Sequence, residues 1–239
     1  MKFLILILGL QAASLTMAQD LVIGIINEMS GEVSVKHVDG TDVGARVGMK
    51  LSIGESVVTA AGASAKVLMK DRNVFFVGES STLNLQEYSS DESKSGATTI
   101  RLEGSAAVKI MRKYDDQEST FRLLTETAVA GVRGTEFSVE QEGAGATKFT
   151  TYEGVVEVGE KLNGRKIESP MRVEKGFQVA TRNGHLDRSG MKHLSSTELK
   201  GARESALRPH AKPAARVEKK TEKHLEKKPE KKSERKPRR

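Results

Sequence analysis

The amino-acid sequence predicts an all-β protein, with short strands in a twisted double sheet or a solenoid-like stack, followed by a short helix and a disordered tail. Between residues 20 and 181, apolar and polar side chains alternate in short segments, as they do along half-buried strands. Turn residues interrupt these segments about every ten positions, which is typical of all-β folds. Helical periodicity is lacking in this region.

The N-terminus has the features of a secretory signal peptide, which we assign to residues 1–18. Lys2 precedes an apolar run, Phe3–Leu10, and small residues lead to a cleavage site after Ala18. A membrane anchor is the alternative, but the run is much shorter than the roughly 20 residues that a spanning helix needs. We therefore expect export, a mature chain that begins at Gln19, and a location in the periplasm or outside the cell.

The body of the protein, residues 19–181, begins with alternating segments that we predict to be strands: Gly31–Val38, Val57–Thr59, Ala65–Lys70, Val74–Val77 and Thr82–Glu87. Asp39-Gly40 and Asp71–Asn73 are turn sequences between these segments. Residues 88–98 are small and polar, which predicts a mobile loop.

The second half of the body continues this pattern, with predicted strands around Ile100–Leu102, Ala106–Ile110, Phe121–Leu123, Phe149–Thr151, Val156–Val158 and Arg172–Thr181. Residues 112–119 are expected to form a charged loop. The stretch Ala128–Glu140 is the most regular. From Thr135 onward, Phe137 and Val139 share one face with it and charged or polar residues share the other, which predicts a half-buried strand.

A short glycine-containing motif recurs in the segments Ser30–Val35, Glu103–Val108 and Glu153–Val158, the middle copy being the loosest. A second motif follows the outer copies: Gly54 lies 23 residues after Gly31, and Gly176 lies 22 residues after Gly154. Matching motifs at matching spacing predict one β unit of about thirty residues, used at both ends of the body. The alternative is two hairpins that share a turn sequence by chance.

The chain after residue 181 has a different character. Residues 182–211 are expected to form a linker with a short helix over about 196–207, because Ser195 and Glu198 form a capping box ahead of a periodic apolar segment. In residues 212–239, glutamate recurs every four positions among lysines, and prolines interrupt the run. Such a segment has too few apolar side chains to offset the entropy of ordering, which predicts disorder.

The positive charge of the protein is concentrated at its C-terminus. Residues 200–239 hold 16 Lys and Arg against 6 Glu, whereas residues 1–199 hold 23 basic and 26 acidic residues. The tail has no aromatic side chain for stacking on bases, which argues against nucleic acid as a partner. Two roles stay open for it: salt-sensitive attraction to anionic envelope polymers, or a solvated segment without a ligand.

The sequence predicts no catalytic residue, no cofactor and no metal site. It has no cysteine, which excludes disulfides and Cys-based zinc sites, and its five histidines have no ligand spacing. Asp115-Asp116 lies in a polar stretch, where solvated surface is the expected role. Gly131–Gly134 lacks the Lys-Ser/Thr pair and the helix of a phosphate-binding loop.

Arg133, between Gly131 and Gly134, is the most unusual residue of the central stretch. It is either a structural arginine that pairs with a carboxylate such as Glu136 or Glu153, or an exposed fork that binds a carboxylate or phosphate. We favour the structural role. Replacing Arg133 with alanine should then lower the thermal stability, and an unchanged melting temperature would contradict this role.

The motifs of the body, taken together, resemble the FecR domain. The resemblance is carried by VAGVRGTEF (Val129–Phe137), YEGVVEV (Tyr152–Val158), EKGFQV (Glu174–Val179) and an upstream pattern over Gly48–Thr59, and it spans about residues 29–181. It identifies a set of residues as structural family positions: Val129, Ala130, Gly131, Val132, Arg133, Gly134, Thr135, Phe137, Gly154, Val156 and Gly176.

The resemblance implies a periplasmic β-rich module. Founding members of this family regulate iron uptake: they span the inner membrane, contact a sigma or anti-sigma partner inside, and sense an outer-membrane transporter. Here a signal peptide is expected in place of the cytoplasmic and membrane-spanning parts. We therefore expect a non-enzymatic interaction or sensing module, whose partner is an envelope protein or an anionic envelope polymer such as peptidoglycan or lipopolysaccharide. A secreted glycan-active β-solenoid is the enzymatic alternative, although tryptophan is lacking.

Overall fold

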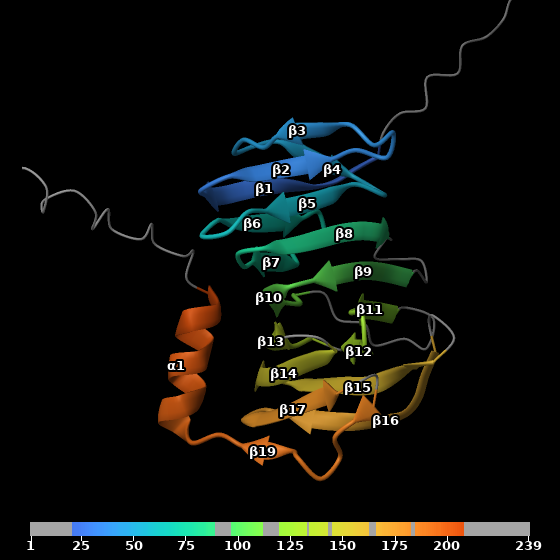
Figure 1. The fold of residues 1–239 in the computed structure, drawn as a ribbon, viewed down its shortest axis with the longest axis vertical. Helices are drawn as coiled ribbons and strands as arrows, with labels where there is room; N and C mark the ends of the chain where they lie inside the picture. Colours follow the sequence, from blue (N-terminus) through green and yellow to red (C-terminus); the bar gives the residue numbers. More distant parts are fainter. Residues whose placement is uncertain are drawn as a thin grey trace, which may run out of the picture.

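A computed structural model of the protein describes residues 21–88, 97–111, 120–132, 134–142, 145–162, 166–182 and 185–207. The predicted signal peptide, Arg133, the charged loop at 112–119 and the tail from residue 212 lie outside these residues. The described chain forms two stacked β-sheets and one helix, with an elongated outline (Figure 1). The predicted fold class is confirmed: the strands lie in a double sheet.

Ten strands form the first sheet, here called sheet A, in the spatial order β4 (Lys50–Ser52), β1 (Val22–Ser30), β6 (Ser64–Met69), β7 (Val74–Val77), β10 (Ser105–Lys109), β13 (Glu136–Glu142), β14 (Ala146–Glu153), β17 (Phe177–Arg182) and β18 (His185–Leu186), with β19 (Lys192–His193) also paired to β17. This order nearly follows the sequence. The chain therefore runs from one end of the sheet to the other, as the colours of Figure 1 show.

Nine strands form the second sheet, sheet B, in the order β3 (Asp42–Gly44), β2 (Val33–Lys36), β5 (Ser56–Thr59), β8 (Ser81–Glu87), β9 (Ala97–Glu103), β11 (Thr120–Leu124), β12 (Ala128–Val132), β15 (Val155–Leu162) and β16 (Lys166–Glu174). The chain alternates between the sheets every one or two strands. β9 and β11 pair in parallel because β10, between them in sequence, belongs to sheet A.

The hydrophobic core lies between the two sheets and extends along the whole stack. Its largest members, Phe75, Phe137 and Phe149 of sheet A and Phe121 of sheet B, are at most 2% exposed. The rings of Phe75 and Phe121 stack across the two sheets with centroids 6.2 Å apart. Burial of such rings is the main favourable term that holds the sheets together, at about 25 cal/mol per Å² of apolar surface.

Most predicted strands are confirmed with shifted ends, and three predictions need correction. The segment Arg172–Thr181, predicted as one strand, is divided between β16 and β17 in different sheets, because the chain crosses at Gly176. β9 begins at Ala97 and Thr98 is 1% exposed, so the predicted loop at 88–98 ends early; the parallel pairing with β11 recruits these small residues into the sheet. In the central stretch, Glu136 and Ser138 are as buried as Phe137. The outer face of β13 is therefore covered, and the strand is not half-buried. β1 lies where no strand was predicted.

The repeated motifs mark the places where the chain crosses from one sheet to the other. Gly31, Gly104 and Gly154 connect β1 to β2, β9 to β10 and β14 to β15, and their φ angles are 75°, 94° and 76°. Gly54 and Gly176, the glycines of the second motif, make crossings with φ of 87°. Left-handed backbone of this kind strongly favours glycine. The repeat is therefore a repeated way of crossing between sheets.

The helix α1 (Ser196–Leu207) confirms the predicted short helix and its capping box. The Ser195 backbone N–H and hydroxyl donate to Glu198 Oε2 at 2.9 and 2.8 Å, and the Glu198 backbone N–H donates to Ser195 Oγ at 3.3 Å. The helix runs along the stack beside sheet A and contacts β10 and β13 (Figure 1). It is the element that covers the outer face of β13.

Gly154 should be intolerant of a side chain for two separate reasons. A Cβ there would lie 2.8 Å from the backbone oxygen of Gly134, and φ is positive. We expect Gly154→Ala to destabilise the protein by roughly 2–5 kcal/mol. Gly40→Ala is the matched control, because Gly40 also has positive φ but has open space around it. It should cost about 1–2 kcal/mol. Equal shifts of the two urea midpoints would contradict the steric contribution.

The helix cap should titrate at unusually low pH. Hydrogen bonds from the backbone and the hydroxyl of Ser195, with Lys192 nearby, lower the pKa of Glu198 from 4.5 to about 2. Because the folded-state pKa is depressed, the cap contributes fully above pH 4.5 and is lost as the pH falls toward 2. An NMR titration of the Glu198 carboxyl should show this midpoint, and Ser195→Ala should raise it. A wild-type midpoint near 4.5 would contradict the cap.

Candidate interaction groove

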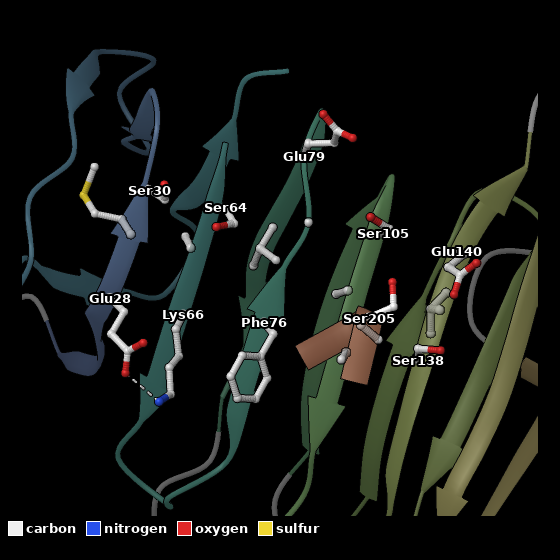
Figure 2. A pocket seen from close by; sticks show the side chains of 18 of the residues that line it. Glu28, Ser30, Ser64, Lys66, Phe76, Glu79, Ser105, Ser138, Glu140 and Ser205 are labelled. Atoms are coloured by element: carbon white, nitrogen blue, oxygen red, sulfur yellow. Dashed lines mark hydrogen bonds and ion pairs between the residues drawn. The ribbon is translucent and has the colours of Figure 1, made fainter. Parts of the chain in front are cut away.

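The outer face of sheet A carries a groove of about 790 Å³. It crosses β1, β6, β7, β10 and β13 and ends at the last turn of α1, where Ser205 and Ala206 line it (Figure 2). Small residues of the sheet, Ser64, Ser105 and Ser138, form part of its lining. The groove exists because small side chains leave space above the strands that α1 does not cover.

One row of paired residues runs across five strands beside this space, and its side chains change from large to small along the sheet. Glu28, Lys66, Phe76, Ala107 and Ser138 are successive register partners on β1, β6, β7, β10 and β13. The large half-buried residues lie where the helix is absent, and Ala107 and Ser138, each 1% exposed, lie where it packs. The Lys66 ammonium lies 5.4 Å from the centre of the Phe76 ring, a cation–π arrangement.

Three carboxylates line the groove at different points along it: Glu28, Glu79 and Glu140. Glu28 accepts from Lys66 Nζ at 2.7 Å and from Asn27 Nδ2 at 3.1 Å. Glu79 accepts from the Gly62 backbone N–H at 2.6 Å, and Glu140 accepts from Lys148 Nζ at 2.7 Å. The hydrogen bond from Lys66 lowers the pKa of Glu28. An ionised carboxylate has about four acceptor sites, so each can bind a further donor.

Ser64 is an exception to the usual pairing of buried polar atoms. Ser64 is 5% exposed, and its side-chain Oγ has no hydrogen-bond partner among the described residues. Figure 2 shows the side chain among those that line the groove. Buried hydroxyls without a partner are uncommon in folded proteins, and a ligand in the groove would supply one.

A partly buried ion pair attaches α1 to sheet A next to this groove. Arg203 donates from Nε to Glu136 Oε1, and from Nη2 to Glu136 Oε2 at 2.8 Å. Two further charges lie at longer distances. Lys109 Nζ is 3.7 Å from Glu136 Oε2, and Glu153 Oε1 is 3.8 Å from Arg203 Nη2. Glu136 is 2% exposed, and the hydrogen bonds to it raise the pKa of Arg203.

This pair was not predicted from the sequence, which suggested Glu136 and Glu153 as partners for Arg133. Both carboxylates contact Arg203, and because Arg133 lies outside the described residues, its own pairing stays a prediction. The sequence nevertheless contains a feature that could have identified Arg203 as a pairing residue. Arg203 is the third residue of the stripe Leu199, Ala202, Arg203, Ala206, which is otherwise apolar, and a charge in such a stripe indicates a buried partner.

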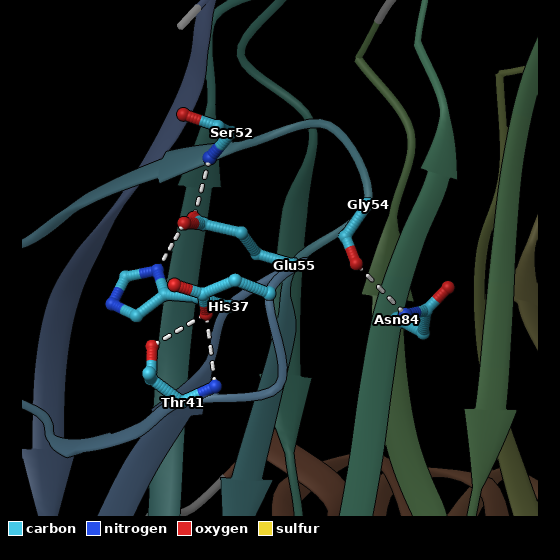
Figure 3. A network of polar contacts seen from close by, with 7 residues as sticks. His37, Thr41, Ser52, Gly54, Glu55 and Asn84 are labelled. Carbon is cyan, nitrogen blue, oxygen red and sulfur yellow. Dashed lines mark hydrogen bonds and ion pairs between the residues drawn. The ribbon is translucent and has the colours of Figure 1, made fainter.

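A second polar network, at the N-terminal end of the stack, ties two turns together. His37 Nδ1 lies 2.5 Å from Glu55 Oε1, and the Ser52 backbone N–H donates to Glu55 Oε2 at 2.8 Å (Figure 3). Asn84 donates to the Gly54 carbonyl at 3.3 Å. These bonds fix the loop between β4 and β5 against its neighbours, so we assign a structural role to the network.

The predicted family positions lie mainly in the core and at the sheet crossings. Val129, Ala130, Val132, Phe137 and Val156 are at most 5% exposed, and Gly131 is half-buried. Gly134, with φ of 56°, and Thr135 pack directly against Gly154. The Gly176 backbone N–H donates to the Thr151 carbonyl at 2.9 Å. Among the described positions, these residues build one edge of the sandwich and do not line the groove.

No group of three or more His, Asp or Glu side chains among the described residues is arranged to hold a metal ion. Within the same residues, none of the helical structure is long and apolar enough to cross a membrane.

The family of the chain follows from comparison with known proteins. The profile of the FecR protein family matches residues 55–157. This chain carries a FecR domain. The resemblance found in the sequence is therefore confirmed, although the matched range is shorter than the 29–181 that the motifs suggested. Strands β6, β7, β10 and β13 of the groove belong to the FecR domain, whereas β1 and α1 flank it.

Solved structures give weaker similarities. Two crystal structures of a candidate anti-sigma factor from Parabacteroides distasonis are 19% and 20% identical to this chain, with TM-scores of 0.48 and 0.47. They match 62% and 61% of this chain, which spans 63% and 62% of theirs. A cell surface anchoring domain matches 26% of this chain and 80% of its own, at 26% identity and a TM-score of 0.25. No curated protein matches the chain.

Removing Arg203 should release α1 from the FecR domain. Arg203→Ala leaves the buried Glu136 carboxylate with Lys109 alone, at 3.7 Å, so we expect a loss of roughly 1–3 kcal/mol in urea unfolding. Glu136→Gln in the same background should recover part of that loss, because the unpaired charge is gone. Lys200→Ala, an exposed change on the same helix, is the control. Equal stability of the Arg203 and Lys200 variants would rule out the attachment.

Proposed function

We propose that this protein is a non-enzymatic FecR-type interaction or signal-sensing module that acts in the cell envelope after export. The FecR-domain match over residues 55–157 carries the proposal, because FecR proteins are regulatory. The groove supports it, because 790 Å³ is within the range of volumes that bind small molecules and short peptide segments. An envelope protein is the partner we favour, and an anionic envelope polymer is the alternative.

The proposed role differs from that of the founding members of the family in its output. The founding members pass a signal through the membrane. We propose that this chain loses its signal peptide on export and recognises its partner in the periplasm or outside the cell, without a membrane-spanning segment of its own. The coarser statement, a regulatory FecR-type module, needs only the family match. The location rests on the signal-peptide features of residues 1–18.

The carboxylates of the groove are the one observation that favours the enzymatic alternative. Glu28 on β1 and Glu140 on β13 are separated by four strand spacings, or about 19 Å. Glu79, after β7, is about two spacings, or about 10 Å, from each of them. Glycosidases place their two carboxyl groups about 5–10 Å apart, so the neighbouring pairs lie at the upper limit of that range. Each groove carboxylate is also bound by a neighbour, as described above. We therefore infer that these side chains serve recognition.

In vivo photo-crosslinking tests the proposal. A photo-reactive phenylalanine analogue would replace Phe76 in the groove, with Val43 on β3 as the control position. Both would be made in the full chain and in a chain that ends at residue 211. We expect the protein in the periplasmic or extracellular fraction and a discrete protein adduct from position 76 only.

Three results would count against parts of the proposal. Retention in the cytoplasm would contradict export, and adducts of equal yield from both positions would contradict a groove-specific partner. If only the full chain is retained on cell-wall material at low salt, the polymer alternative holds, with the tail as its binding segment. Release of soluble sugars from that material by the purified protein would restore the enzymatic alternative.

A further inference from the structure

The groove continues the path that α1 follows along sheet A. The helix begins beside the end of the stack formed by β17 and β19 and runs toward β10, where it ends at Leu207 (Figure 1). Its last turn contributes Ser205 and Ala206 to the groove. From there the groove extends across β7 and β6 to β1. The residue after Leu207 therefore leaves the helix at one end of the groove.

The segment that follows has a composition unlike the rest of the tail. Arg208–Val217, RPHAKPAARV, has three cationic residues and no carboxylate, whereas glutamate recurs every four residues from Glu218 onward. Its two prolines disfavour continuation of the helix and favour extended backbone. Its other members are mostly alanine. It is thus a short, basic, small-residue segment suited to an extended conformation.

The groove complements this segment in charge and in spacing. Its lining contains three carboxylates and one ammonium group, that of Lys66. Glu140, Glu79 and Glu28 come from β13, the end of β7 and β1, so neighbouring carboxylates are about two strand spacings, or about 10 Å, apart. Cations four residues apart in an extended chain of about 3.1 Å per residue are about 12 Å apart.

The floor of the groove also suits a peptide backbone. Serine and alanine side chains leave room for a chain to approach the strands, and Ser64 Oγ has no partner among the described residues. A peptide backbone carbonyl above Ser64 would accept a hydrogen bond from that hydroxyl. The reach is sufficient: from β10 to β1 is three strand spacings, about 14 Å, which five or six extended residues cover.

We propose that residues 208–217 bind in this groove in an extended conformation, as an intramolecular occupant that a partner of the groove must displace. The attachment to α1 gives the segment an effective concentration of about millimolar, so weak contacts suffice. Residues beyond 217 stay available for other contacts. The inference goes beyond the proposed function and does not depend on it, because it concerns the purified chain alone.

Disulfide trapping in the full chain tests this proposal, since the natural sequence has no cysteine. Ser30→Cys on β1 and Ala214→Cys in the segment would be combined in one protein. We expect a disulfide to form within single molecules, at a rate independent of protein concentration. Reversing the segment charges with Lys212→Glu and Arg216→Glu should slow it by about tenfold, because attraction to the groove carboxylates becomes repulsion while the chain length is unchanged.

The outcomes are distinct. An unchanged rate in the charge-reversed protein would overturn the proposal, because the proposed binding requires attraction between the segment and the groove carboxylates. Disulfides that appear only between molecules would assign the groove to a second copy. Absence of a disulfide, with both thiols open to an alkylating reagent, would leave the groove to an external partner and also overturn it. Circular dichroism of each variant checks that the sheets are intact.

Discussion

Three of the crossings between the sheets, at Gly31, Gly104 and Gly154, bring backbone against backbone, and this constraint shapes the fold. At Gly154 a side chain would meet the backbone of Gly134, and at Gly104 it would meet that of Ser80 and Ser81, so the crossings stack only where Cβ atoms are missing. The stack in turn sets the register that puts Phe75 and Phe121 in contact. The glycine motifs of the family are therefore requirements of architecture, which explains why they lie away from the groove.

The two faces of sheet A meet different demands. The inner face packs against sheet B and is mainly apolar, although the buried threonines Thr147, Thr151 and Thr181 share it with Phe149 and Val179. The outer face is covered by α1 over β10 and β13, and a side chain such as Glu136 becomes buried there only because Arg203 arrives from the helix to neutralise it. Over β1, β6 and β7 the same face carries Lys66 and Phe76, which tolerate water. The groove lies at the boundary between the part of this face that α1 covers and the part that is open to water.

Much of the fold could be predicted from the sequence, because alternation and turn residues are local signals. The helix over 196–207 followed from its capping box. The repeated glycine motifs predicted a repeated β unit, and the structure places their glycines at crossings between the sheets. Long-range pairing could not be read in this way. Thr98 enters a strand because β11 pairs with it in parallel, and Glu136 is buried because of a residue 67 positions later. The groove was not predicted, since it depends on which strands the helix leaves uncovered.

The groove joins the FecR domain to elements outside it, and this arrangement bears on how such a module could be specific. Four of its strands belong to the FecR domain, whereas β1, with Glu28, and α1, with its ion pair to Glu136, lie outside the matched residues. Two FecR domains with the same sandwich could thus present different grooves if their flanking segments differ. In this chain the flanking helix closes one end of the groove and precedes a basic segment in the sequence. Recognition would then be set by the flanks, while the domain supplies the rigid floor.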